Sequence, residues 1–254
     1  MICKGEFVSM NKKWESIESE FGKDFLDKNF MGPNSMMIMA ELAESLDLQP
    51  GMKVLDLGCG KGLTSFYLAK YFNVTVFATD LWISATENLE RVNFLGLDDR
   101  VYPIHAEARA LPYAKNFFDV AVSVDAYHYF GTGESYLENY FAPLVKKGGQ
   151  IAIVVPGVTE AFYENGASEG LKKHSEAVAK TGEFQTFKSN IWWRRLWERS
   201  GVVEIVKSYD LKCFKEAWND WLYSGSEIGK GDISFIESDT DNQLSLVAVI
   251  AKRT

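Results

Sequence analysis

The amino-acid sequence predicts an α/β fold, in which a mostly parallel sheet carries helices on both faces. Between residues 51 and 155, short runs rich in β-branched residues alternate with longer segments of helical periodicity. This alternation is typical of repeated strand–helix–strand units. A glycine-rich stretch, "GCGKG", directly follows the first of these runs. The 254 residues, 46% of them hydrophobic, suffice for one large core, so we expect one sheet domain with additions.

Seven apolar runs are the expected strands of this sheet. Five lie in the alternating region, at Lys53–Leu57, Val74–Thr79, Val101–His105, Val120–Val124 and Gln150–Val155, and two later runs, Val202–Asp210 and Leu244–Arg253, are expected to close the sheet. Helices are expected between the first five at Leu63–Tyr71, Ile83–Leu95 and Tyr136–Val145. We interpret "KKGG", which follows the last of these, as a helix end with cations and a terminating glycine.

The composition disfavours several classes of protein. A net charge of −8 argues against a nucleic-acid partner, whose binding depends on clustered Lys and Arg. The apolar runs are far shorter than the roughly 20 residues that cross a bilayer, and the N-terminus lacks the apolar segment of a signal peptide. Cys3, Cys59 and Cys213 show no disulfide or zinc spacing. We therefore expect a cytoplasmic protein with no membrane contact and no metal.

The glycine-rich stretch is expected to bind a ligand. Gly58, Gly60 and Gly62 let the backbone approach a bound group and let the following helix present its first N–H groups. A Walker loop would require Ser or Thr after Lys61, and a dinucleotide fingerprint would require glycine where Leu63 stands. Neither of these two phosphate-binding motifs is therefore predicted.

The observed spacing, with Asp56 ahead of Gly58, Cys59, Gly60 and Gly62, resembles motif I of the class I S-adenosylmethionine-dependent methyltransferases. In that family the loop wraps the methionine part of the cofactor. The resemblance therefore implies S-adenosylmethionine as the cofactor and S-adenosylhomocysteine as the product.

Two later motifs follow in the order of this family. The second strand ends at Asp80, followed by Leu81 and Trp82; the resemblance implies that Asp80 accepts hydrogen bonds from the ribose hydroxyls and that the next two residues pack on the adenine. The stretch "HAEARALPYAKNFFD" is similar to the family's "DA…LPF…FD" pattern, with Glu107 in place of the usual Asp and Ala108 beside it. The resemblance implies that Glu107 accepts from the adenine amino group.

The resemblance covers roughly residues 45–156 and implies a particular sheet. This is the seven-stranded Rossmann-like sheet of order 3-2-1-4-5-7-6, with the last strand antiparallel. The domain layout expected from it is an N-terminal helical cover over residues 1–49, a cofactor-binding core over 50–156, a helical insertion over 157–200, and closing strands over 201–254 with an inserted cover segment at about 211–243.

The loop after the fourth strand carries the candidate catalytic residues. Ligands bind at the carboxyl ends of strands in such sheets, and this loop reads "VDAYHYF". Asp125 is expected to bind the amino group of the cofactor or to orient the methyl acceptor. His128 is the candidate general base, although the resemblance also allows a structural role for a histidine here.

The expected acceptor is a small molecule with an N, O or S nucleophile. Aromatic residues are dense in the three additions, where they can line a pocket for a planar or cationic acceptor or pack against the sheet. Alternatives stay open: a methyltransferase acting on protein or RNA, a methylene transfer to a lipid, or a non-catalytic S-adenosylmethionine-binding protein. A homodimer is a further possibility.

Overall fold

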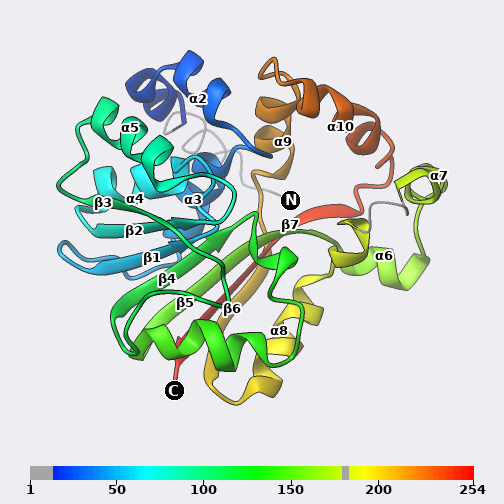
Figure 1. Cartoon of the computed structure of the whole chain (residues 1–254). Helices are drawn as coiled ribbons and strands as arrows, with labels where there is room; N and C mark the ends of the chain where they lie inside the picture. Colours follow the sequence, from blue (N-terminus) through cyan, green and yellow to red (C-terminus); the bar gives the residue numbers. More distant parts are fainter. Residues whose placement is uncertain (1–13, 179–182) are drawn as a thin grey trace.

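The computed structural model describes residues 14–178 and 183–254 and contains a central seven-stranded sheet (Figure 1). Its strand order is β3-β2-β1-β4-β5-β7-β6, and β7 runs antiparallel to both of its neighbours. The strands are β1 (Lys53–Leu57), β2 (Thr75–Asp80), β3 (Val101–His105), β4 (Phe118–Val124), β5 (Val145–Val158), β6 (Val203–Asp210) and β7 (Leu244–Arg253). This order confirms the predicted fold class.

Helices cover both faces of the sheet. The α-helices are α2 (Lys23–Asn29), α3 (Ser35–Ala43), α4 (Leu63–Phe72), α5 (Ala85–Leu95), α6 (Glu160–Asn165), α7 (Glu169–Val178), α8 (Asn190–Ser200), α9 (Phe214–Leu222) and α10 (Glu227–Glu237). Side chains from α3, α4 and α9 pack on one face of the sheet, and side chains from α8 pack on the other. Figure 1 shows α2, α9 and α10 at the same end of the molecule.

Two hydrophobic cores follow from the alternation of side chains along each strand. In β1, Val54 belongs to one core and Leu55 to the other; in β5, Val154 and Ile153 divide in the same way. The side chains of these four residues are fully buried. Both faces of the central strands are therefore apolar, which explains why these strands are continuous hydrophobic runs in the sequence.

One predicted helix is wrong. Where a helix was expected at Tyr136–Val145, the chain forms a π-helix at Leu137–Phe141, then a short 3-10 turn at Ala142–Leu144 that contains Pro143. Proline cannot continue a helical hydrogen-bond ladder, and Val145, the first residue after the turn, already pairs with β4. The "KKGG" stretch accordingly lies inside β5 and does not end a helix.

The expected N-terminal cover begins in residues that the structure does not describe, since residues 1–13, including Cys3, lie outside the described ranges. Over residues 14–178 and 183–254, no helix has the length and apolar character that a membrane span needs. The division of the chain into domains stays a prediction.

Candidate active site

A cavity of about 240 Å³ opens where the carboxyl ends of β1, β2, β3 and β4 meet. Four segments that follow these strands line it, together with a fifth from the N-terminal region. The lining residues include Gly58, Cys59, Gly60 and Lys61; Asp80, Leu81 and Trp82; Glu107, Ala108 and Arg109; Asp125, Ala126, Tyr129 and Phe130; and Asn29, Met31, Gly32, Pro33 and Ser35. Open α/β sheets bind their ligands at this edge.

The glycine loop is shaped by close approach to the loop after β4. Gly58 has φ +74°, and a Cβ at this position would lie 2.3 Å from the Cβ of Ala126, so no larger residue fits. The N–H groups of Gly58 and Cys59 both donate to the Thr79 carbonyl, at 2.8 and 3.1 Å. Gly62 also has positive φ and precedes α4, but it does not line the cavity. The loop therefore presents bare backbone to the cavity.

Asp80 holds two loops together at the cavity. Its carboxylate accepts from the backbone N–H of Gly60 at 2.8 Å, of Trp82 at 2.7 Å and of Ile83 at 2.9 Å. A carboxylate offers about four lone-pair sites, so one acceptor site is left for a ligand. Only 8% of the residue is exposed, and its position at the end of β2 places that remaining site at the cavity.

Asp56 lies beneath the glycine loop and does not line the cavity. Its Oδ2 accepts from the hydroxyls of Thr64 at 2.5 Å and Ser65 at 2.6 Å, both in the first turn of α4. Its Oδ1 is buried and has no hydrogen-bond partner among the described residues. Burial raises the pKa of the Asp56 carboxyl to about 6. Asp56 thus fixes the start of α4 against β1, a step removed from any ligand.

Glu107 lines the cavity and forms an ion pair with Arg109. Arg109 was not among the site residues expected from the sequence. Glu107 accepts from the Arg109 backbone at 2.6 Å and from Nη1 of the same residue at 3.0 Å. The Tyr136 hydroxyl donates to the carbonyl of Ala108 at 3.0 Å, and Arg109 Nη2 donates to the Phe130 carbonyl at 3.4 Å. These bonds join the loop after β3 to the loop after β4.

Asp125 and His128 end up in different environments. Asp125 lines the cavity with φ +55°, an uncommon conformation for a residue other than glycine. A Cβ at Gly32 would lie 2.3 Å from its Oδ2. His128 is 3% exposed and is not among the cavity-lining residues. Desolvation lowers the pKa of its imidazole to about 4, so the ring is neutral near pH 7.

Aromatic side chains form one rim of the cavity. Trp82 is 67% exposed and Tyr129 48% exposed, and their ring centroids are 5.5 Å apart. Leu81, next to Trp82, is also largely exposed. Exposed aromatic rings beside a cavity provide an apolar surface on which a planar group can stack.

The N-terminal wall of the cavity was also missed. Sequence reasoning recognised "GPNS" at Gly32–Ser35 as a break between helices, but no spacing in the sequence connects it to the glycine loop.

Across residues 14–178 and 183–254, no three or more His, Cys, Asp or Glu side chains are grouped so as to hold a metal ion.

Comparison with family models gives matches over the site region. A model described as "Methyltransferase domain" matches residues 54–149, and one described as "Protein-L-isoaspartate(D-aspartate) O-methyltransferase (PCMT)" matches residues 6–98. The first match contains the glycine loop and the motifs after β2, β3 and β4.

Two curated relatives are similar to part of this chain. Phosphoethanolamine N-methyltransferase 1 of Arabidopsis thaliana is 33% identical in a 179-residue alignment that covers 59% of this chain and 36% of that protein. The 27-O-demethylrifamycin SV methyltransferase of Amycolatopsis mediterranei is 29% identical over 143 residues, 56% of this chain and 50% of that protein. The chain thus spans about a third to a half of the length of these relatives.

Solved structures share the fold. Phosphoethanolamine N-methyltransferase 2 of Haemonchus contortus, in complex with S-adenosyl-L-methionine, has a TM-score of 0.68 at 21% identity, covering 92% of this chain and 55% of that one. Geranyl diphosphate C-methyltransferase of Streptomyces coelicolor, in complex with S-adenosyl-L-homocysteine, has a TM-score of 0.65 at 18% identity, covering 85% and 80%. In strand order, in the motifs at the carboxyl edge and in the family match over residues 54–149, the chain is similar to the class I S-adenosylmethionine-dependent methyltransferases.

Proposed function

We propose that this protein transfers a methyl group from S-adenosylmethionine to a small-molecule acceptor with an N, O or S nucleophile, releasing S-adenosylhomocysteine. The observation that carries the proposal is the cavity, which gathers the glycine loop, Asp80, Glu107 and Asp125 from the ends of four strands. The relatives support a small acceptor, since they are named for phosphoethanolamine and for a rifamycin.

The residues at the cavity fit this cofactor. The bare backbone of the glycine loop leaves room for the methionine part, and the remaining acceptor site of Asp80 suits a ribose hydroxyl. We assign the adenine to the region of Leu81, Trp82 and Ala108, with Glu107 as acceptor for its amino group. Because Glu107 also accepts from Arg109, the adenine amino group would share that carboxylate.

The protein's task in the reaction is positioning. The sulfonium cofactor brings its own leaving group, so the chain must align the acceptor with the methyl and keep water out, which can supply several kcal/mol. We assign this alignment to Asp125, which lines the cavity beside Gly32. It can accept from an amine or hydroxyl of the acceptor, or from the amino group of the cofactor.

His128 is our candidate base, and its environment defines what it could do. Its neutral imidazole can accept a proton, but its low pKa of about 4 makes it a weak base. Its side chain is buried next to the Tyr129 ring, with centroids 4.0 Å apart, and Tyr129 itself lines the cavity. A catalytic role for His128 therefore requires a local rearrangement that brings its ring to the cavity.

The test is incubation with S-adenosylmethionine labelled in its methyl group, together with separate metabolite, protein, RNA and lipid fractions. Label in the metabolite fraction supports the proposal, and the mass of the product identifies the acceptor. Label in another fraction instead supports the corresponding alternative. Binding of S-adenosylhomocysteine without label transfer to any fraction indicates a non-catalytic binding protein.

We further propose a reducing cytoplasmic location and a possible homodimer. The described cysteines, Cys59 and Cys213, are both free and buried, which suits a reducing compartment. Light scattering of the purified protein measures the oligomeric state directly, and fractionation of cells that express the full chain tests the location.

A further inference from the structure

The segment between α2 and α3 forms one wall of the cavity. Asn29, Met31, Gly32, Pro33 and Ser35 all line it. The sulfur of Met31 lies 3.1 Å from where a Cβ of Gly60 would be, and Gly32 packs against the carboxylate of Asp125. This wall, residues 29–35, therefore touches both the glycine loop and the residue that follows β4.

On the sheet side, two cations hold the start of the wall. Lys61, in the glycine loop, donates from Nζ to the Lys28 carbonyl at 2.8 Å. Arg91 of α5 donates from Nε to the Asn29 side-chain oxygen at 2.8 Å. These contacts fix the end of α2, but they do not reach the residues that follow it toward α3.

The other end of the wall is held by Asn34. This side chain is fully buried, and its Oδ1 accepts from the Met37 N–H at 3.0 Å, capping α3. Its Nδ2 donates to Oδ2 of Asp220 at 2.6 Å, and its backbone N–H donates to the Ala217 carbonyl at 2.9 Å. Two of these three bonds end on α9, which is separated from Asn34 by more than 180 residues of sequence.

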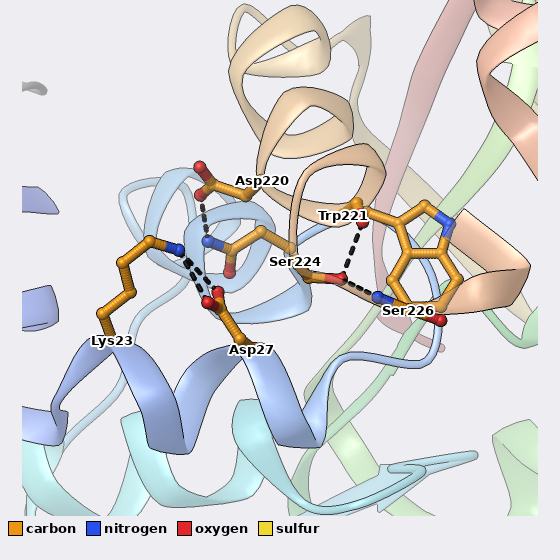
Figure 2. A network of polar contacts seen from close by, with 7 residues as sticks. Lys23, Asp27, Asp220, Trp221, Ser224 and Ser226 are labelled. Carbon is orange, nitrogen blue, oxygen red and sulfur yellow. Dashed lines mark hydrogen bonds and ion pairs between the residues drawn. The ribbon is translucent and has the colours of Figure 1, made fainter. Parts of the chain in front are cut away.

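Helix α9 is itself anchored at its other end. The Glu41 carboxylate, 7% exposed, accepts from the backbone N–H groups of Lys212 at 2.9 Å and Cys213 at 3.0 Å. Asn34 and Glu41 lie toward opposite ends of α3, so α3 and α9 are joined at both ends by hydrogen bonds to buried side chains. Figure 2 shows Asp220 on α9 facing α2, above the Lys23–Asp27 ion pair.

We propose that Asn34 and Asp220 are positioning residues through which α9 fixes the cavity wall in the arrangement that binds the cofactor. Residues 30–34 of the wall belong to no helix or strand, so the bonds of Asn34 hold the end of the wall that the contacts of Lys61 and Arg91 do not reach. Without Asp220 a buried amide N–H would lose its acceptor, which disfavours the present geometry. The inserted segment between β6 and β7 thereby contributes to cofactor affinity as well as to any acceptor cover. This inference rests on the proposed function.

The test uses three variants that separate capping from positioning. Asn34→Ser keeps a hydroxyl that can cap α3 but is too short to reach Asp220. Asp220→Leu removes the acceptor, whereas Asp220→Asn keeps an oxygen that can still accept. The measurements are the Kd for S-adenosylhomocysteine by calorimetry, KM and kcat for S-adenosylmethionine, and hydrogen exchange of peptides spanning residues 29–35 without ligand.

We expect Asn34→Ser and Asp220→Leu to raise Kd roughly tenfold, as for one lost bond to a charged group. KM should rise more than kcat falls, exchange should quicken over residues 29–35, and Asp220→Asn should stay near wild type. The matched control is Asp27→Asn, which breaks the neighbouring ion pair with Lys23 and should leave all three measurements unchanged. If Asp220→Leu fails to fold, Asn34→Ser still tests the bond.

Two outcomes overturn the inference. One is an unchanged Kd in Asn34→Ser and in folded Asp220→Leu. The other is unchanged exchange over residues 29–35, which would show that α9 does not fix the wall. If wild type itself fails to bind S-adenosylhomocysteine, the proposed function fails first; the exchange experiment then still decides separately whether Asp220 holds the wall.

Discussion

Replacing Asp80 by alanine tests whether one carboxylate both shapes the cavity and binds the ribose. Asp80→Ala leaves the N–H groups of Gly60, Trp82 and Ile83 without their acceptor. An unsatisfied buried donor costs about 1–3 kcal/mol. Because water from the cavity can reach these groups, we take the lower figure, which gives about 3 kcal/mol in total. At about 2–4 °C for each kcal/mol, Tm should fall by about 6–12 °C.

The same change should weaken cofactor binding. Loss of the remaining acceptor site removes one charge-assisted bond to a ribose hydroxyl. The binding free energy of S-adenosylhomocysteine should therefore weaken by about 1–3 kcal/mol, which raises Kd roughly 5- to 150-fold. Calorimetry gives Kd, and thermal unfolding with and without the ligand gives Tm. The control is Asp99→Ala, since Asp99 is an exposed acid whose side chain forms an ion pair with its neighbour Arg100.

The two readouts separate the two roles of Asp80. A lower Tm with an unchanged Kd would show that the carboxylate braces the loops but that the ribose assignment is wrong. If both Tm and Kd match wild type, the three backbone hydrogen bonds do not contribute as their geometry indicates, and the reasoning about this loop fails. Asp99→Ala should alter neither quantity measurably, because an exposed ion pair contributes little.

Three further changes test other parts of the site. Gly58→Ala, with φ +74° and a Cβ 2.3 Å from that of Ala126, should destabilise the fold by about 3 kcal/mol or more; a wild-type Tm would contradict the close approach. Because the folded pKa of Asp56 is raised from 3.8 to about 6, its contribution of about 3 kcal/mol is present below pH 4 and is lost as pH rises through 6. Asp56→Asn should remove this part of the pH dependence in denaturant titrations, and identical profiles would refute it. His128→Ala should lower kcat with little change in Kd, and equal turnover would leave His128 a structural role.

The sheet could be predicted because its signals are local. Runs such as Lys53–Leu57, Val101–His105 and Leu244–Arg253 match β1, β3 and β7 in their bounds. Most residues of β1 and β7 are buried, whereas β3 lies at the edge of the sheet and is largely half-buried or exposed. The start of β5 was missed because glycine after two lysines is also a helix-end signal. Here a Cβ at Gly149 would lie 2.6 Å from the Asp119 carbonyl, so the glycine serves close packing within the sheet.

In the candidate site, too, some residues could be placed from the sequence and others could not. Asp80 and Glu107 end or follow strands, and parallel strands bring their carboxyl ends to one edge, so their meeting could be predicted from order alone. Arg109 was missed because its bond to the Phe130 carbonyl depends on how two loops approach. Asp125 and His128 are three residues apart, yet Asp125 lines the cavity, whereas His128 lies within the 3-10 turn Tyr127–Tyr129 and is buried.

The N-terminal wall shows why such contacts escape sequence reasoning. Gly32 fits against Asp125 only because no Cβ intervenes, and Asn34 is held by a helix from the far end of the chain. Neither relation has a period or a spacing, since each exists only after the sheet has brought distant segments together. The motifs that we assign to the cofactor can therefore be predicted from the sequence, whereas the wall beside them depends on how distant segments pack in the folded chain. If this holds more widely, proteins that share these motifs but differ in cofactor affinity should differ in the residues that correspond to the wall at residues 29–35.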